Sequence, residues 1–203
     1  MVCSTKHESW SIPYSPDLSA SKNAIIYIME LIDTMLHTEA GSAEKQLNDG
    51  LHIYVDGSFS SDTQTGGWAF VVYHNEIQIA SASGRLRARS NGHTEILGFL
   101  RALEWIAISK TGEDVVVWSD SHYVVDGCNR LLKIWRNNRW KRVVANPRER
   151  KRSIPDLEEW QAVNRTLADF TSTTIRWCKG HSGRAGNEEA DKLASVRLLD
   201  GGT

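Results

Sequence analysis

The chain has few cysteines, and none of them forms a recognisable motif. The three cysteines, Cys3, Cys128 and Cys178, are far apart and include no C-x-x-C pair. Such an odd, scattered set argues against both a disulfide framework and a zinc site. Because thiols stay reduced inside cells, we expect a cytoplasmic, intracellular location.

The sequence also lacks a long apolar run and a signal-peptide pattern. Its longest apolar stretch, residues 24–36, is interrupted by Glu30 and Asp33, and the first residues do not combine a charged start with an apolar segment. A membrane-spanning helix needs about 20 predominantly apolar residues. We therefore expect no membrane segment in this chain.

Net charge is almost absent, yet charge is unevenly distributed. The 24 Lys and Arg residues nearly balance 25 Asp and Glu residues, and the formal charge of −1 by itself implies no nucleic-acid partner. Residues 130–152, however, contain ten basic residues and one acid, so this segment carries +9 and the rest of the chain −10. A segment of this kind is either a solvated face or a surface for phosphates.

Residues 1–50 differ in composition from the rest of the chain, and we expect an N-terminal extension of unknown role. It contains apolar residues at helical spacing, which predict one amphipathic helix. The helix would pack on the main domain or on a second copy, or belong to a substrate-binding module. The apolar stripe consists of Ile25, Ile28, Met29, Ile32, Met35 and Leu36.

From residue 51 the pattern becomes mixed α/β. Three strand-like runs come one after another, with Gly66-Gly67 as an expected turn, and strands then alternate with helical segments. The predicted order is β-β-β-α-β-α-α-β-α. It indicates an α/β fold with a mixed five-stranded sheet, its first three strands antiparallel, flanked by helices. We expect one catalytic domain over residues 51–199 and a tail over 200–203.

Four acidic residues occupy positions that attract attention only as a group. Asp56 and Asp120 each end a predicted strand, and residues at the carboxyl ends of parallel strands line the usual ligand crevice of such sheets. Glu95 lies near the start of an apolar helix, and Asp191 lies in the last helix. Taken singly, each has an ordinary explanation as a turn, cap or helix-dipole residue.

The motifs around these acids resemble type 1 ribonuclease H. They occur in the family's order and cover nearly all of residues 51–199. The matching stretches are DGS at 56–58, GGW at 66–68, Ser90-Asn91 before the helix that carries Glu95, SDS at 119–121, WRNNRWK at 135–141 and GHSGRAGNEEADKLA at 180–194.

This resemblance implies a metal-dependent catalytic site. In the family the four acidic positions, here Asp56, Glu95, Asp120 and Asp191, hold two Mg²⁺ ions, and Mn²⁺ is a possible substitute. The residue types suit this role because Mg²⁺ prefers oxygen ligands. The resemblance also implies that His181 assists proton transfer or product departure. Glu188 could join the cluster, or cap its helix.

The resemblance further implies contacts to nucleic acid. The family grips the DNA strand of a hybrid with a basic protrusion, which corresponds here to the +9 segment. The sequence departs from the family's common residues at Ser60-Ser61-Asp62, Gly92, His122 and Arg139, which concern strand selectivity rather than the metal ligands. The expected substrate-binding residues are Ser58, Ser90, Asn91, Tyr123, Trp135, Trp140 and Lys141.

The implied function is that of an endonuclease, expected to be a monomer, that hydrolyses the RNA strand of RNA–DNA hybrids and leaves 5′-phosphate and 3′-hydroxyl ends. An alternative is a hybrid-binding relative with an inactive site or altered strand selectivity. A transposase, resolvase or proofreading exonuclease would lack the GHSG…GNEEAD motif. A reverse transcriptase's ribonuclease domain is a further possibility, as a fragment of a longer protein.

Overall fold

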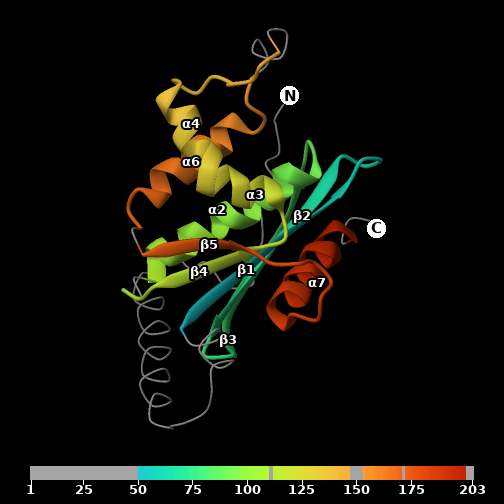
Figure 1. Ribbon diagram of the computed structural model, residues 1–203. Helices are drawn as coiled ribbons and strands as arrows, with labels where there is room; N and C mark the ends of the chain where they lie inside the picture. Colours follow the sequence, from blue (N-terminus) through green and yellow to red (C-terminus); the bar gives the residue numbers. More distant parts are fainter. Residues whose placement is uncertain (1–49, 110–111, 147–152, 171, 200–203) are drawn as a thin grey trace, which may run out of the picture.

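A computed structural model of the protein describes residues 50–109, 112–146, 153–170 and 172–199. The predicted helix of the extension and the tail over residues 200–203 lie outside the described residues. Figure 1 shows the elements, which are β1 (Leu51–Ser60), β2 (Thr65–His74), β3 (Ile77–Arg87), α2 (Asn91–Ser109), β4 (Val115–Ser119), α3 (His122–Asp126), the π-helical turn η2 (Gly127–Leu131), α4 (Leu132–Asn137), α6 (Leu157–Leu167), β5 (Thr173–Trp177) and α7 (Ala185–Leu199).

The strands form one mixed sheet in the order β3-β2-β1-β4-β5. β1 pairs with β2, and β2 with β3, in antiparallel fashion, whereas β4 pairs with β1 and β5 in parallel fashion. The predicted five-stranded sheet with three antiparallel strands at its start is therefore confirmed. Its parallel half requires the helical crossovers that the sequence pattern indicated.

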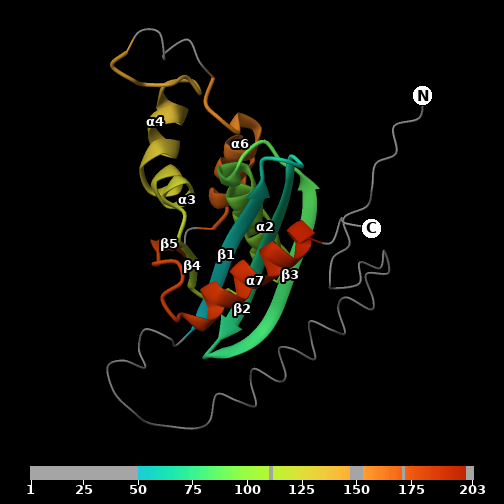
Figure 2. The same ribbon diagram turned by 90° about the vertical axis from the view of Figure 1, so that its right-hand side faces the viewer.

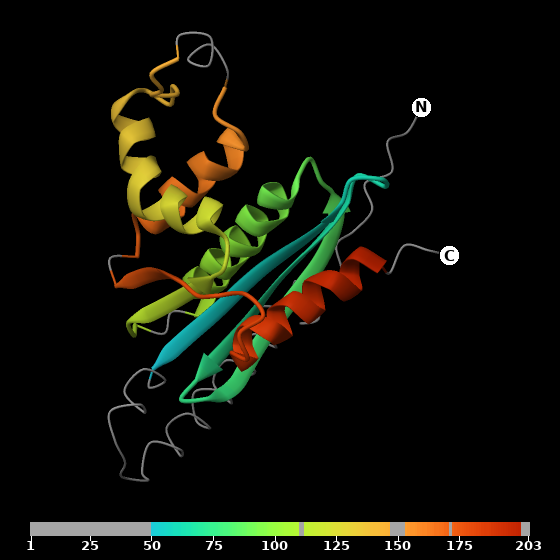
Figure 3. The same cartoon turned by 45° about the vertical axis from the view of Figure 1, so that its right-hand side comes forward.

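Helices cover both faces of the sheet. α7 packs on one face against β1, β2 and β3, and α2 packs on the other face with α6 behind it (Figures 2 and 3). The segment predicted as one helix after Asp120 is divided into α3, η2 and α4, which continue into one another without a break. Within the described part of the chain, no helix combines the length and apolar character needed to cross a bilayer.

The central strand β1 is buried on both sides because both helical layers pack on it. Ile53 and Val55 point into the core beneath α2, whereas Tyr54 points into a smaller cluster beneath α7 with Trp118 and Val71. This alternation reflects the two-residue period of a strand. The next residue on the α7 side is Asp56, so the period carries an acidic side chain to the edge of the apolar layer.

Two local expectations about this region were wrong. Gly66 and Gly67 belong to β2, and residues 61–64 make the turn instead. Added Cβ atoms would overlap the side chain of Thr94 at Gly66 and the carbonyl oxygen of Ala194 at Gly67, so these glycines serve helix packing. Asp56 also does not end its strand, because residues 57–60 remain paired with β2.

A glycine in the α3–α4 segment gives a first testable prediction. A Cβ at Gly127 would overlap the indole of Trp160, whose side chain is fully buried. Gly→Ala in a helix normally stabilises by up to about 1 kcal/mol. Here we expect Gly127→Ala to lower the free energy of unfolding by about 1–3 kcal/mol through overpacking, measured by urea denaturation. Arg130→Ala, at an exposed position in the same turn, is the control and should change it little.

Candidate active site

Two carboxylates lie side by side on adjacent parallel strands. β1 and β4 pair with Val55 opposite Ser119, so the next residue on each strand is an aspartate, Asp56 or Asp120. The indole Nε1 of Trp177, at the end of β5, donates to the main-chain carbonyl of Asp120 at 3.1 Å. Strand pairing therefore fixes the main chain at both aspartates.

Glu95, the third carboxylate, is brought to this edge by the first turns of α2. A Cβ at Gly57 would overlap the main chain of Thr94 and Glu95, so the glycine allows the helix to pack closely against β1. The hydroxyl of Ser121 donates to Oε2 of Glu95, and the amide of Asn91 donates to Oε1 at 2.7 Å. These two donors hold the carboxylate in one orientation.

Asp191, the fourth carboxylate, comes from α7 on the other face. The hydroxyl of Ser195 donates to its Oδ1 at 3.4 Å, and Nδ1 of His181 lies 3.7 Å from its Oδ2. His181 has an 82% exposed side chain and a φ of 49°, which places it in a left-handed turn. The carboxylate of Glu188 accepts the backbone N–H of Gly183 at 2.8 Å, so Glu188 anchors the loop that carries the histidine.

The four carboxylates act on one another electrostatically. Burial and the neighbouring charges of Asp120, Asp191 and Glu95 raise the pKa of Asp56 to about 8, against a hydrogen bond from the Gly57 N–H that lowers it. Burial, and to a lesser extent the charge of Asp120, also raises the pKa of Glu95, although its hydrogen bond from Ser121 opposes the shift. In the absence of a cation, this site disfavours its own ionised form.

This donor set fits a hard divalent cation. Asp56 is only 8% exposed, and each of the charges that shift its pKa belongs to another carboxylate. A cation between these groups would replace mutual repulsion by attraction, and Mg²⁺ prefers oxygen ligands of this type. The four predicted metal-binding residues are thus brought together at one edge of the sheet.

Sequence comparison identifies the family to which this fold and site belong. Residues 48–198 match the profile of the RNase H family. The chain belongs to the RNase H family. Relatives named Ribonuclease H from Francisella philomiragia and Francisella tularensis subsp. novicida are each 30% identical over 147 residues, which is 72% of this chain and 90% of theirs.

Solved structures show the same RNase H fold. The PFV RNase H domain is 23% identical with a TM-score of 0.63, and the alignment covers 76% of this chain and 98% of that domain. A foamy viral protease-reverse transcriptase in complex with RNA/DNA hybrid gives 19% identity and a TM-score of 0.64, over 82% of this chain and 22% of the viral protein. LC9-RNase H1, described as a type 1 RNase H, gives 23% and 0.60, over 80% and 75%.

Three of the predicted substrate-binding residues lie at the active-site edge of this RNase H domain. Ser58 is half-buried on β1, two residues beyond Asp56. The hydroxyl of Ser90 accepts the N–H of His93 at 3.1 Å and so caps the start of α2. Asn91 is exposed, but its amide nitrogen already holds Glu95. Ser90 and Asn91 thus also have structural roles.

The predicted aromatic contacts are placed differently. Trp135 is 8% exposed and its ring packs against Trp160 at 5.4 Å between centroids, so it belongs to the core and its ring is not presented to a ligand. Tyr123 accepts the indole N–H of Trp160 at 2.8 Å and is half-buried. Trp140 is half-buried against the same core, whereas Lys141 is exposed. The alternating basic and aromatic pattern therefore reflects partly a helix that packs through its tryptophans.

A second polar cluster was missed by sequence reasoning. Ligand atoms of His93, Asp156 and Glu159 lie within 4.8 Å of one another, the composition of a metal site. The guanidinium of Arg89 already contacts Asp156 at 2.9 Å and Glu159 at 2.8 Å. Burial would raise the pKa of Glu159, but hydrogen bonds and charge from Arg89 hold it below its usual value.

This Arg89–His93–Asp156–Glu159 network connects the start of α2 to the start of α6. His93 is 4% exposed, and its Nε2 lies 3.1 Å from Glu159. Because Arg89 supplies the balancing positive charge, the cluster is an ion-pair network that fixes two helices rather than a metal site. No local motif announces it, since its two halves are more than 60 residues apart in the chain.

The raised pKa of Asp56 predicts an unusual pH dependence of stability without divalent cations. An acid whose pKa is raised on folding binds more protons in the folded state, so its contribution is fully present below about pH 4 and is lost as pH rises toward 8. Asp56→Asn should remove this loss and unfold at higher free energy than the wild type at pH 8, by on the order of 2 kcal/mol. Denaturation in chelator from pH 5 to 8.5 measures the difference.

Added Mg²⁺ provides the internal control for this prediction. It should stabilise the wild type more than Asp56→Asn, because the variant has lost one ligand. Equal stability of the two proteins at pH 5 and pH 8 in chelator would contradict the assignment of a raised pKa to this carboxyl.

Proposed function

We propose that the protein is an endonuclease that hydrolyses the RNA strand of RNA–DNA hybrids and leaves 5′-phosphate and 3′-hydroxyl ends. The proposal assigns two Mg²⁺ ions to Asp56, Glu95, Asp120 and Asp191, with Mn²⁺ as a possible substitute. The observation that carries it is the meeting of these four carboxylates at one edge of an RNase H sheet. Bound there, the ions supply Lewis-acid chemistry for displacement at a phosphodiester.

The chain's own groups prepare this chemistry by orienting oxygen atoms. Strand pairing fixes Asp56 and Asp120, while Ser121 and Asn91 hold the two oxygens of Glu95. Because the pKa of Asp56 is about 8, a cation must compete with a proton at this carboxyl near neutral pH. Metal affinity should therefore increase from pH 6 to pH 8.

His181 is placed to move a proton at the rim of the site. Its imidazole is exposed and lies 3.7 Å from Asp191, within a loop that Glu188 anchors through Gly183. An imidazole titrates near neutral pH and so can accept or deliver a proton under working conditions. We assign it an assisting role in proton transfer or product departure.

Hybrid as the substrate is supported by the family and by the charge distribution. One of the similar structures, the foamy viral protein, was solved in complex with RNA/DNA hybrid. Residues 130–152 concentrate ten basic side chains after the helix that begins beside Asp120. Cationic side chains there can pair with the phosphates of a duplex that lies across the carboxylates.

The proposal includes a cytoplasmic, monomeric enzyme. Cys128 and Cys178 are free thiols, and Cys178 is buried, with its Sγ 3.2 Å from the side-chain oxygen of Asn187. Burial raises the pKa of Cys178 to about 11, which keeps the thiol protonated and unreactive. These features suit a reducing compartment.

Removal of one carboxylate provides the central test. Asp120→Asn should lower the rate of hybrid cleavage by about 10³-fold or more, since the loss of a metal ligand removes several kcal/mol of transition-state stabilisation and 1.36 kcal/mol equals a factor of ten. The assay uses end-labelled RNA–DNA hybrid, double-stranded RNA, single-stranded RNA and DNA with Mg²⁺. Product ends are identified by phosphatase and ligase treatment.

Asp126→Asn is the matched control, because Asp126 is exposed in the helix after Asp120. It should cut at the wild-type rate. A wild-type protein that leaves the hybrid intact would refute the proposed activity. Tight binding without cleavage would instead support the alternative of a hybrid-binding relative.

The basic segment makes a separate prediction about salt. Replacing Lys141, Arg142, Arg150, Lys151 and Arg152 with Gln should weaken hybrid binding and reduce the slope of log K against log salt. If all five side chains contact phosphates, the slope should fall by up to about 4.5. Fluorescence anisotropy between 50 and 300 mM salt, a range of roughly a factor of six, measures this change.

Arg165→Gln is the control for the salt experiment. Arg165 is exposed in the last turn of α6, on the part of the domain opposite the carboxylates. Its replacement should leave the slope unchanged. An unchanged slope in the five-residue variant would show that the basic segment is only a solvated face.

A further inference from the structure

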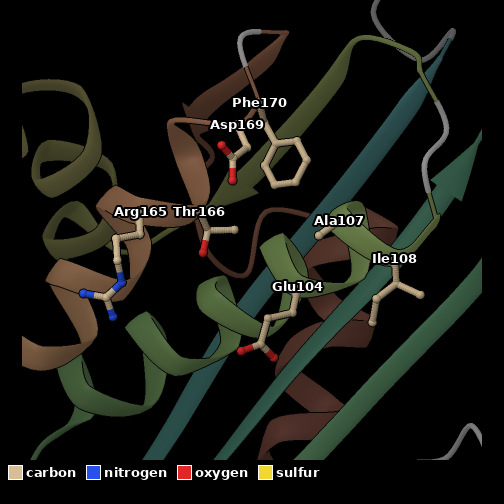
Figure 4. A pocket seen from close by; sticks show the side chains of 7 residues that line it. All are labelled: Glu104, Ala107, Ile108, Arg165, Thr166, Asp169 and Phe170. Atoms are coloured by element: carbon tan, nitrogen blue, oxygen red, sulfur yellow. The ribbon is translucent and has the colours of Figure 1, made fainter.

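A surface groove lies between the ends of α2 and α6. It has a volume of about 450 Å³ and is lined by Glu104, Ala107 and Ile108 from α2 and by Arg165, Thr166, Asp169 and Phe170 from the end of α6 and the residues after it. Figure 4 shows Phe170 and Thr166 on one side and Ala107 and Ile108 on the other. The side chain of Ile108 is 69% exposed, the largest exposed fraction among the large hydrophobic residues of the described chain.

The groove is far from the carboxylates. α2 carries Glu95 near its start and Ile108 near its end, and 13 residues of helix span about 20 Å. The active site lies where β1 and β4 approach their carboxyl ends, whereas the groove lies near the amino ends of these strands (Figure 3). An occupant of the groove would therefore leave the catalytic edge accessible.

Residues 1–49 join the domain at this same end. Leu51 is opposite Val115, and Val115 is opposite Thr173, so Leu51 and Thr173 are separated by two strand spacings, about 10 Å. The N–H of Thr173 donates to the carbonyl of Phe170, a lining residue of the groove, at 3.4 Å. Gly50 thus delivers the preceding chain next to the groove.

The preceding chain contains a matching apolar surface. Its predicted stripe runs from Ile25 to Leu36 and repeats at helical spacing. Thirteen residues separate Leu36 from Gly50, and they can span up to about 45 Å. On a helical projection Asp33 flanks the stripe, where it could face Arg165 on the rim of the groove.

We propose that this groove binds the apolar stripe of residues 25–36 of the same chain. The stripe buries Ile108 and the exposed edge of Phe170, and the short distance from Gly50 makes the contact intramolecular. The extension is then a brace on the end of the domain opposite the carboxylates. This inference does not depend on the nuclease activity.

Disulfide trapping in the full chain tests the proposal. In a Cys3→Ser background, Ile32→Cys is combined with Ile108→Cys or, as the control, with Val196→Cys, which replaces a 45% exposed residue of α7 on the opposite face. Under mild oxidation the groove pair should form a closed monomer at least about tenfold faster than the control pair, because docking raises the effective concentration of the two thiols. Gel mobility and mass measure the product.

Two further variants make the result decisive. Ile32→Cys with Ala107→Cys provides a second groove position in case the first pair has poor disulfide geometry. Adding Ile108→Asp to that pair should slow closure to the control rate. Equal rates for groove and control pairs, or no closed product from either groove pair, would overturn the proposal. A disulfide-linked dimer would also overturn it, since a second copy would then be the occupant.

Discussion

Four carboxylates of like charge can share one edge of a sheet only if their main chains cannot move apart. Burial and repulsion within this group hold the pKa of Asp56 near 8, so the folded chain stores an unfavourable interaction at its centre. β1 and β4 resist it through strand pairing between two packed layers. The strain of the site is thus supported by the core, and a divalent cation would convert the same geometry from a cost into a binding site.

Close packing at glycines transmits this rigidity to the helices. Gly57 admits the first turn of α2 to β1, and Gly186 admits the start of α7 to the ring of Tyr54. A Cβ added at Gly180 would overlap the carboxylate of Asp120. Each of these positions lies within a few residues of the catalytic edge. A methyl group at any of them would displace a carboxylate rather than merely disturb the fold, which links packing directly to function.

The sequence predicted the element order, the mixed sheet and the four carboxylates, because period-two and helical patterns and ordered motifs are local signals. It failed where a residue's role depends on distant neighbours. Gly66-Gly67 was expected to form a turn, but packing against Thr94 and α7 explains these glycines. Trp135 was expected to meet nucleic acid, but Trp160 draws it into the core. The network around Arg89 likewise joins residues that no motif connects.

α2 is the element through which these parts communicate. Its first turns carry Asn91 and Glu95 at the site and His93 in the ion-pair network with α6, while its last turn forms a wall of the groove. α6 contacts the same two regions, through Glu159 at its start and Thr166 at its end. A helix held at both ends against one neighbour cannot tilt without breaking the network or opening the groove. A segment bound in the groove would therefore steady Glu95 from about 20 Å away, by stiffness alone and without a contact to the site.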